Sequence, residues 1–385
     1  MFDVDVIIPC YGKSELIRPG LYALASSWKR EFVHVTLVND CSPNTDCNYQ
    51  DLVDEFRGKL DVRVITTPEN GGQGLARQYG VDNTSREWFL FQDEDDQYLP
   101  LTLSQMVGCV ETFGMHISPD GRVECDENGK PIIDQGLPKV AMVSAPVFEF
   151  DDQHTHVITS QNRVWVNAKL YNRQFWKKHD VRFLPESSRH SEDYQMMNRW
   201  FYALDFDKEW CGLNMNDDQL MYLWNPNTLS QSRKDPFYGH MLHSWTMRSG
   251  ILSLQYYKAH RELAGDMFDT YYRSAVLNMA TYNYHGCMSF IDRILNHEWI
   301  CTEEEWGIFI QAAKDLWYEY RQCDAVQPFT QFEKEDQSEA VRHRSDCQQT
   351  YRNILFTFED FVHGLVPYFQ WTYEQAKNAY EEKVA

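Results

Sequence analysis

The chain of 385 residues is predicted to fold as an α/β protein with a mainly parallel sheet, followed by an α-helical part. Two observations carry this prediction. Short apolar runs alternate with helical patterns over the first hundred residues, which is typical of right-handed β-α-β units with helices on both faces of a sheet. From about Phe237 onward, apolar residues recur at helical spacing instead. We place the two domains at 1–235 and 236–385, because the length suits two domains.

The alternation in the first part is regular. Strands are expected at 4–9, 33–38, 62–65 and 88–92, and helices at 14–28, 49–60 and 75–83. In parallel sheets, ligands bind beyond the carboxyl ends of the strands. Three polar segments follow such strand ends: Pro9-Cys10-Tyr11, Asn39-Asp40 and Asp93-Glu94-Asp95. We therefore expect these segments to meet in one crevice.

The acidic stretch FLFQDEDD at 89–96 is the most informative segment of the chain. Residues at alternate positions of a strand point to the same side, so Asp93 and Asp95 are expected to face one way. Two like charges held close are costly unless a cation joins them. Such carboxylates suit Mg²⁺ or Mn²⁺ that also binds a substrate's phosphates. The alternative is a solvated acidic turn after a strand.

Composition limits the class of protein. The net charge of −21 argues against general nucleic-acid binding or a basic membrane-binding face, although a segregated basic patch would still allow either. No apolar run reaches the length of a transmembrane helix, and Asp3 and Asp5 stand where a signal peptide would be basic. The ten cysteines lack metal-binding spacing and resemble reduced thiols. We therefore expect a cytoplasmic protein without a transmembrane segment.

Two regions bear on organisation rather than chemistry. The turn dipeptides Asp120-Gly121 and Asn128-Gly129 predict a β-hairpin insertion at 113–140, which we expect over an acceptor cleft. Helices are expected at 247–263, 267–282 and 306–320, with capping boxes at Thr302/Glu305 and Thr372/Gln375. Their dense aromatic residues favour a helix core. Sugar stacking and a homo-oligomer interface are the alternatives.

The order of motifs resembles a known family. The segments VDVIIPCYGKSELI, LVNDCSPN, ENGGQGLARQYGV and FLFQDEDDQYLP are similar to the nucleotide-binding half of family 2 glycosyltransferases of the GT-A fold. Three positions depart from the family pattern: Asn39 replaces an Asp, Gln78 replaces an Asn, and Glu94 fills a position that is often small. The resemblance implies an inverting enzyme that uses a UDP-sugar donor with Mn²⁺ or Mg²⁺, and a nucleotide-sugar half at 1–100.

A second set of motifs extends the resemblance to about residue 232 and implies an acceptor half at 141–235. The segments 165–175 and 222–230 resemble the family's acceptor and closing segments, and RFLP at 182–185 precedes Glu192-Asp193. The resemblance implies that Asp193 is the general base and that Glu192 binds the acceptor or holds the loop. The alternative for both is a pair of helix-start carboxylates favoured by the helix dipole.

The resemblance also implies donor-side roles. Asp40 would accept a hydrogen bond from uracil, or make an Asx turn with Ser42 and Pro43. Asp95 would bind the metal, and Asp93 would contact the metal, its water or the ribose. Arg77 would pair with these carboxylates or with the phosphates, unless it is an exposed helix arginine. The nucleotide-binding set is Pro9, Tyr11, Asp40, Arg77, Asp93 and Glu94.

Further basic residues remain open. Lys169, Arg233 and Lys234 lie near motif segments and would touch the diphosphate or face solvent. His240 or His243 would complete a metal site. The leading function is transfer of a sugar to a hydroxyl of a glycan-type acceptor. Alternatives are a glycosyltransferase acting on modified, hydroxymethylated DNA bases, a catalytically silent nucleotide-sugar-binding protein, and a nucleotidyltransferase.

Overall fold

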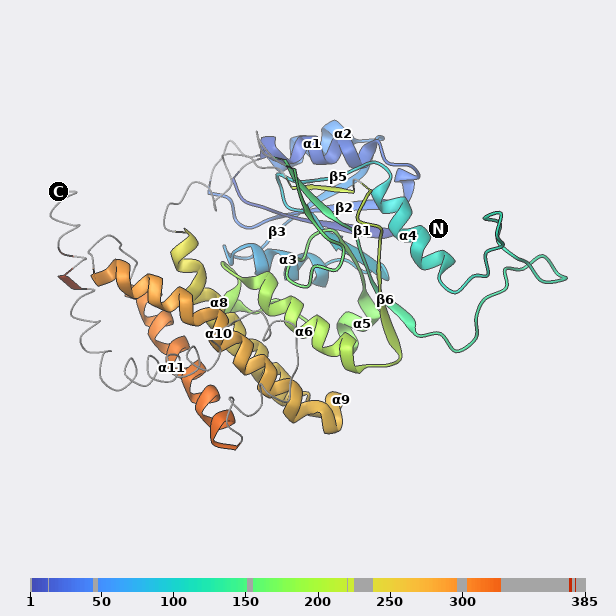
Figure 1. The fold of residues 1–385 in the computed structure, drawn as a ribbon. Helices are drawn as coiled ribbons and strands as arrows, with labels where there is room; N and C mark the ends of the chain where they lie inside the picture. The colour runs from blue at the N-terminus through green and yellow to red at the C-terminus, as the bar shows by residue number, and fades with distance from the viewer. Residues whose placement is uncertain are drawn as a thin grey trace. The chain divides into compact units, whose positions relative to one another are not determined.

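The computed structural model describes most of the chain in two units, Met1–Ser230 and Gln231–Ala385 (Figure 1). The described residues are 2–12, 14–43, 48–150, 155–219, 221–224, 238–295 and 303–326, together with 374, 375 and 378. The predicted boundary at 235–236 falls outside these residues, so it stays a prediction.

The first unit is built on a seven-stranded sheet with the order β10-β6-β9-β4-β1-β2-β3. The strands are β1 Val4–Cys10, β2 Val33–Asn39, β3 Asp61–Thr66, β4 Trp88–Phe91, β6 Lys139–Ser144, β9 Lys169–Asn172 and β10 Trp210–Asn214. Neighbouring strands run parallel, except that β9 is antiparallel to both β4 and β6. The mainly parallel α/β sheet predicted from the sequence is confirmed.

Helices cover both faces of this sheet. They are α1 Ser14–Ala25, α2 Tyr49–Phe56, α3 Gln73–Asp82, α4 Thr102–Thr112, α5 Arg173–Lys178 and α6 Glu192–Phe206. In Figure 1, α1 and α2 lie on one face and α3 on the other. The alternation of β1 explains the two layers, because Val6 packs in the core beside α1 and α2, whereas Ile7 packs in the core beside α3 and α6.

A four-stranded sheet with the order β5-β11-β7-β8 adjoins the acidic segment. Its strands are β5 Gln97–Tyr98, β7 Val147–Phe150, β8 Thr155–Ile158 and β11 Tyr222–Trp224. The Tyr98 hydroxyl donates to the Phe91 carbonyl at 3.0 Å, and the Tyr98 and Tyr222 rings meet edge to face. The first contact ties β5 to the end of β4, and β11 pairs with β5, so both strands are anchored next to the segment between Phe91 and Gln97.

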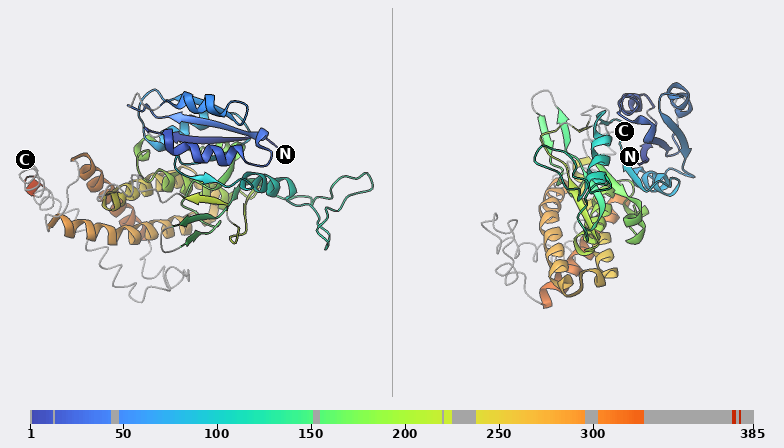
Figure 2. Two further views of the ribbon diagram at one scale, coloured as in Figure 1. Left: turned by 90° about the horizontal axis from the view of Figure 1, so that it is seen from above. Right: turned by 90° about the vertical axis from the view of Figure 1, so that its right-hand side faces the viewer.

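The insertion after α4 forms irregular antiparallel pairs rather than regular strands. Isolated bridges join Met115 to Ile133, Ile117 to Val123, and Cys125 to Pro131. Both predicted turns are present, with Gly121 and Gly129 at positive φ. The segment extends outward on the side of the N-terminus (Figures 1 and 2), away from the carboxyl end of β1. This placement contradicts the expectation that it covers the acceptor cleft, because α4 carries the chain to the opposite edge.

The second unit is helical, as predicted. Its elements are α8 Tyr238–Ala259, α9 Arg261–Ala264, the short 3₁₀ helix η3 Gly265–Met267, α10 Phe268–Leu295 and α11 Glu303–Val326. Helices α8, α10 and α11 pack against one another, and Tyr256, Tyr257 and Tyr272 are buried. Burial of these rings agrees with the helix-core interpretation. Oligomerisation through these helices stays a prediction.

Several expectations fall on parts of the second unit that the structure leaves undescribed. Thr302 and Thr372 of the two capping boxes lie outside the described residues, as do the side chains of His240 and His243. Among the described helices, none combines the length and apolar character needed to cross a membrane.

Candidate active site

The acidic segment is a turn rather than a strand end. The strand β4 stops at Phe91, and the Asp96 N–H donates to the Asp93 carbonyl at 3.1 Å. The argument from strand alternation is therefore wrong, because Asp93 and Asp95 stand on a turn. Asp96 is buried and accepts a hydrogen bond from the Tyr222 hydroxyl, while Asp93, Glu94 and Asp95 are partly exposed.

Both oxygens of Asp93 accept hydrogen bonds. Arg77 Nη2 lies 2.5 Å from Asp93 Oδ1, and Asn167 Nδ2 lies 2.8 Å from Asp93 Oδ2. Sequence reasoning gave Asn167 no role, although it lies in the segment 165–175 that resembles the family. Asn167 precedes β9, and the antiparallel course of that strand brings its beginning to the edge where β4 ends.

Arg77 is buried in α3 with 2% of its surface exposed, so it is not an exposed helix arginine. Its Nη1 lies 2.6 Å from Glu192 Oε1, so its guanidinium bridges Asp93 and Glu192. Burial lowers the pKa of Arg77, but the charges of Asp93 and Glu192 outweigh that and raise it above its ordinary value. The predicted pairing of Arg77 with carboxylates is present.

Glu192 and Asp193 occupy the first turn of α6. Glu192 is 2% exposed, whereas Asp193 is partly buried and accepts a hydrogen bond from the Tyr194 N–H at 2.7 Å. Burial, followed by the charge of Glu192, raises the pKa of Asp193 to about 7. A carboxyl group that titrates near neutral pH can accept a proton more readily than an ordinary aspartate.

Lys169 opens β9 and is 2% exposed. Burial lowers the pKa of Lys169 to about 7, against the opposing effect of the Asp193 charge. The solvated-surface interpretation of Lys169 is therefore wrong, because the amino group belongs to the interior near Asp193. Arg233 and Lys234 lie outside the described residues.

Asp40 holds the glycine-rich loop before α3. Its Oδ1 accepts from the Gly71 N–H at 3.0 Å, and its Oδ2 accepts from the Gly72 N–H at 2.8 Å. Thr67 Oγ1 donates to Oδ1 as well. The Asx turn considered for Asp40 is absent, because both of its oxygens bond to the glycine loop and the Ser42 N–H donates to Asn39 Oδ1 at 3.0 Å instead. A contact between Asp40 and a nucleobase stays a prediction.

The glycine loop packs directly on the segment before α6. The Gly74 N–H donates to the Ser188 carbonyl at 2.8 Å. A Cβ added at Gly74 would lie 2.9 Å from the Glu192 Cβ, closer than real Cβ atoms approach. Gly72 also has φ +85°, a conformation that favours glycine. Glycine is needed here for close approach of two segments as well as for the turn.

The first strand reaches the acidic turn through its backbone. Pro9 pairs in register with Val38 inside the sheet, and the Tyr11 N–H donates to Glu94 Oε2 at 3.1 Å. The Tyr11 side chain is 48% exposed. Contacts therefore join the end of β1 to the acidic turn, the turn to α3, and α3 to α6. The predicted crevice residues from these segments are brought together.

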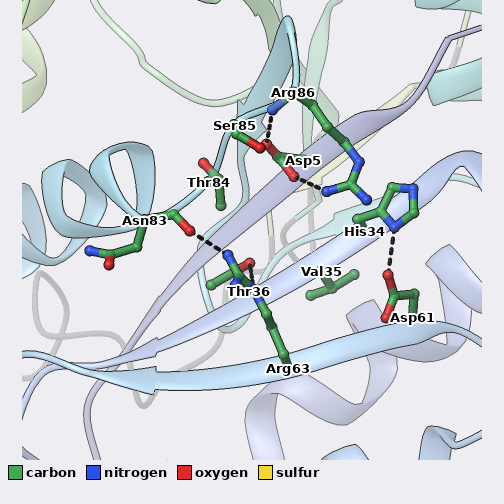
Figure 3. Close-up of a pocket in the computed structure, with 10 residues that line it drawn as sticks. All are labelled: Asp5, His34, Val35, Thr36, Asp61, Arg63, Asn83, Thr84, Ser85 and Arg86. Carbon is green, nitrogen blue, oxygen red and sulfur yellow. Dashed lines mark hydrogen bonds and ion pairs between the residues drawn. The ribbon is translucent and has the colours of Figure 1, made fainter.

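A separate pocket of about 240 Å³ lies at the other edge of the sheet, where β1, β2 and β3 begin (Figure 3). Arg86 pairs with Asp5 and His34 with Asp61, and Arg63 donates to the backbone carbonyl of Asn83. Because this pocket is at the amino ends of the strands, it is distinct from the site around Arg77.

Comparison of the sequence with protein families identifies the class of enzyme to which the first unit is similar. Residues 5–179 match the family described as glycosyl transferase family 2. The first unit is a family 2 glycosyltransferase domain of the GT-A fold.

Particular relatives share this domain. The chain is 28% identical over 199 residues to poly(ribitol-phosphate) beta-N-acetylglucosaminyltransferase TarS of Staphylococcus aureus, covering 50% of this chain and 31% of that protein. It is 24% identical over 200 residues to succinoglycan biosynthesis protein ExoO of Rhizobium meliloti, covering 51% and 54%. The matches thus span about a third to a half of these relatives.

The similarity of fold extends further along the chain. The structure of S. aureus TarS 1–349 in complex with UDP-GlcNAc aligns with a TM-score of 0.58 at 16% identity, over 93% of this chain and 92% of that one. The complex of the same TarS segment with UDP gives 0.56 at 16% identity, with the same coverage. At this level of identity the likeness establishes the fold.

Proposed function

We propose that this chain transfers a sugar from a UDP-sugar to a hydroxyl group of a glycan-type acceptor, with inversion and with a divalent cation. The observation that carries the proposal is the buried bridge Asp93–Arg77–Glu192, which joins the acidic turn to the first turn of α6, where Asp193 follows Glu192. Transfer from a nucleotide sugar needs both a group that neutralises the leaving diphosphate and a base for the acceptor.

The donor assignment draws on the nucleotide-binding half. The backbone around Gly71 and Gly72 is held by Asp40 at the carboxyl end of β2, where ligands bind in such sheets. The solved TarS complexes contain UDP and UDP-GlcNAc. We assign the same nucleotide here, with uracil next to Asp40 and Tyr11 and the diphosphate next to the acidic turn.

The chemistry of the acidic turn suits Mg²⁺ or Mn²⁺, which prefer oxygen ligands. Asp95 would be the first residue to hold the cation, and Asp93 would be the second, through lone pairs beyond those that Arg77 and Asn167 use. Among the described residues, the structure has no cluster of three or more His, Cys, Asp or Glu side chains suited to a metal. Phosphate oxygens and water would then complete the coordination. When bound, the cation would offset negative charge on the leaving diphosphate.

Asp193 supplies the base. The acceptor oxygen forms a bond to the anomeric carbon while the bond from that carbon to the diphosphate oxygen breaks. The diphosphate leaves with the electron pair of the broken bond, and the acceptor proton passes to the Asp193 carboxylate. A pKa of about 7 leaves a large fraction of Asp193 ionised at neutral pH and able to take this proton.

The test is a panel of nucleotide sugars incubated with the protein and Mn²⁺, with or without glycan acceptors, and scored by release of the nucleotide. We expect release of UDP, faster with Mn²⁺ than with EDTA and faster with an acceptor than without one. Absence of nucleotide release from every donor in the panel would contradict the proposal. If UDP is released equally fast in EDTA, the reaction does not need a divalent cation, and that part of the proposal is wrong.

A further inference from the structure

Arg77 connects three segments that are far apart in the sequence. It lies on α3 and reaches Asp93 of the acidic turn and Glu192 at the start of α6 at 2.5 and 2.6 Å. Its guanidinium also lies 5.9 Å from the centre of the Phe183 ring. Both terminal nitrogens are engaged, and with 2% exposure the side chain is enclosed.

We propose that Arg77 is a positioning residue that sets the placement of Asp93 relative to the first turn of α6, and that Glu192 is its anchor rather than a ligand of the acceptor. This inference rests on the proposed function, in which Asp93 serves the donor and Asp193 takes the acceptor proton. The three residues Asp93, Arg77 and Glu192 are called the arginine bridge below.

The surroundings of Glu192 support the anchor role. Its side chain is almost fully buried, and its Cβ and Cγ pack against Gly74. Its Oε1 is engaged by Arg77. An acceptor hydroxyl would have to enter between the glycine loop and α6 to reach this carboxylate. Asp193, the next residue, is the more exposed of the two.

The chemistry of arginine explains why this residue can fix geometry. A guanidinium is planar and always charged, and it presents its donors in a rigid fork. Its two terminal nitrogens contact carboxylates on two different segments, so movement of either segment strains the other contact. A lysine would keep the charge but could not hold both carboxylates in one fixed plane. Small displacements of reacting groups can lower rates about a hundredfold.

The experiment uses hydrolysis of UDP-GlcNAc in the absence of an acceptor, because water then replaces the acceptor and acceptor binding plays no part. We compare Arg77→Lys, Glu192→Gln and the double variant in the full chain. We expect each single change to lower the hydrolysis rate about 10²-fold, and the double variant to be no slower than the slower single one. Glu192→Gln with the parental hydrolysis rate, or effects that multiply, would overturn the proposal.

A matched control is the surface ion pair between Arg18 and Glu55, which joins α1 and α2 at 3.0 Å. Arg18→Lys and Glu55→Gln should leave hydrolysis unchanged. Thermal unfolding of every variant separates loss of folded protein from loss of rate. If a single change at the arginine bridge prevents folding, the double variant Arg77→Gln/Glu192→Gln is used instead, because it replaces both charges by neutral amides. We expect this double variant to fold and to hydrolyse UDP-GlcNAc slowly. The parental rate in that folded variant would overturn the proposal.

A second measurement keeps this inference separate from the proposed function. If the parent releases no UDP from any nucleotide sugar, the proposed function fails. In that case, the affinity of the protein for UDP in the presence of Mn²⁺, measured by titration calorimetry, tests whether Arg77 positions Asp93. We expect Arg77→Lys to weaken Mn²⁺-dependent UDP binding about tenfold, because Asp93 loses its fixed partner. Unchanged affinity would overturn the positioning role.

Discussion

The Tyr222 hydroxyl donates a hydrogen bond to Asp96 Oδ2 at 2.6 Å, although 126 positions separate the two residues. Both side chains are buried. The same hydroxyl lies 3.4 Å from the Asp93 N–H, which donates to it. One phenol group of β11 therefore holds the two ends of the acidic turn, and the candidate metal ligands depend on a residue from the far end of the first unit.

Replacing Tyr222 by Phe tests this dependence. The change removes a hydrogen bond to a buried carboxylate, and we expect the free energy of unfolding to fall by about 1–3 kcal/mol. Chemical denaturation measures the loss. The control is Tyr318→Phe, because Tyr318 is 56% exposed and its hydroxyl is not needed to order a buried segment. Equal stability of the two variants would contradict a structural role for the Tyr222 hydroxyl.

A change at Asp40 should disturb the glycine loop. Asp40→Asn leaves one acceptor oxygen for two backbone N–H groups and turns an N–H₂ group toward one of them. We expect a loss of about 1–3 kcal/mol in the free energy of unfolding and weaker UDP binding. Denaturation and calorimetry measure the two effects. Asp54→Asn, on an exposed part of α2, is the control that should change neither.

Asp95 is predicted to be the main metal ligand. Asp95→Asn keeps the shape of the side chain and removes its charge, so we expect the folded variant to lose the stimulation of UDP release by Mn²⁺. Loss of leaving-group stabilisation should raise the barrier by several kcal/mol, roughly a 10²-fold or greater loss of rate. Circular dichroism checks the fold. A variant that responds to Mn²⁺ as the parent does would show that the metal binds elsewhere.

The raised pKa of Asp193 predicts a pH dependence of transfer. The carboxyl group must be ionised to accept a proton, so the rate should rise with pH and level off above about 7. Asp193→Asn should lower transfer by about 10²-fold or more and remove this midpoint, while UDP binding survives. If Asp193→Asn transfers sugar at the parental rate while Glu192→Gln is inactive, the base is Glu192.

The same group should affect stability in a defined direction. The folded-state pKa of Asp193, about 7, is higher than the unfolded value of about 3.9, so folding favours the protonated form. Its contribution to stability is complete below about pH 4 and is lost as the pH rises to about 7. Asp193→Asn removes this contribution. The parent should therefore lose stability relative to Asp193→Asn over that interval, as measured by unfolding at several pH values.

A glycine comparison tests the packing of α3 against α6. Gly74→Ala places a Cβ within 2.9 Å of the Glu192 side chain, so we expect displacement of the first turn of α6 and slower UDP release. The control is Gly108→Ala in α4, where a Cβ meets nothing within 4 Å. That change should stabilise α4 by about 1 kcal/mol and leave activity unchanged. Equal activity of the two variants would contradict the coupling between α3 and α6.

The alternation of strand and helix patterns predicts much of the fold, because each pattern depends only on residues that are close in the sequence. Expected strands at 33–38 and 62–65 correspond to β2 and β3, and the helices at 14–28 and 75–83 correspond to α1 and α3 within a few residues. The short strand β9 is different. It has four residues and is buried on both faces, so no hydrophobic alternation marks it.

For the candidate site too, some features could be predicted from the sequence and others could not. Strand ends in a parallel sheet meet by rule, so Tyr11, Asp40 and the acidic turn could be placed together from the sequence. The burial of Arg77 and Lys169 could not, because it arises from tertiary contacts, such as the one between Arg77 and Glu192, 115 positions apart. Nothing local distinguishes a lysine in the interior from one on the surface. The role of Asp40 as acceptor for two loop N–H groups likewise depends on a tertiary contact.

Strand β9 runs antiparallel to its neighbours, so two different parts of the chain contribute residues to the candidate site. The carboxyl ends of β1, β2 and β4 carry Tyr11, Asp40 and the acidic turn. Asn167, just before β9, and Lys169, its first residue, reach the same edge of the sheet from the opposite chain direction. Asn167 donates to Asp93 from just before β9, so this connection reaches the acidic turn without passing through the strands of the first hundred residues.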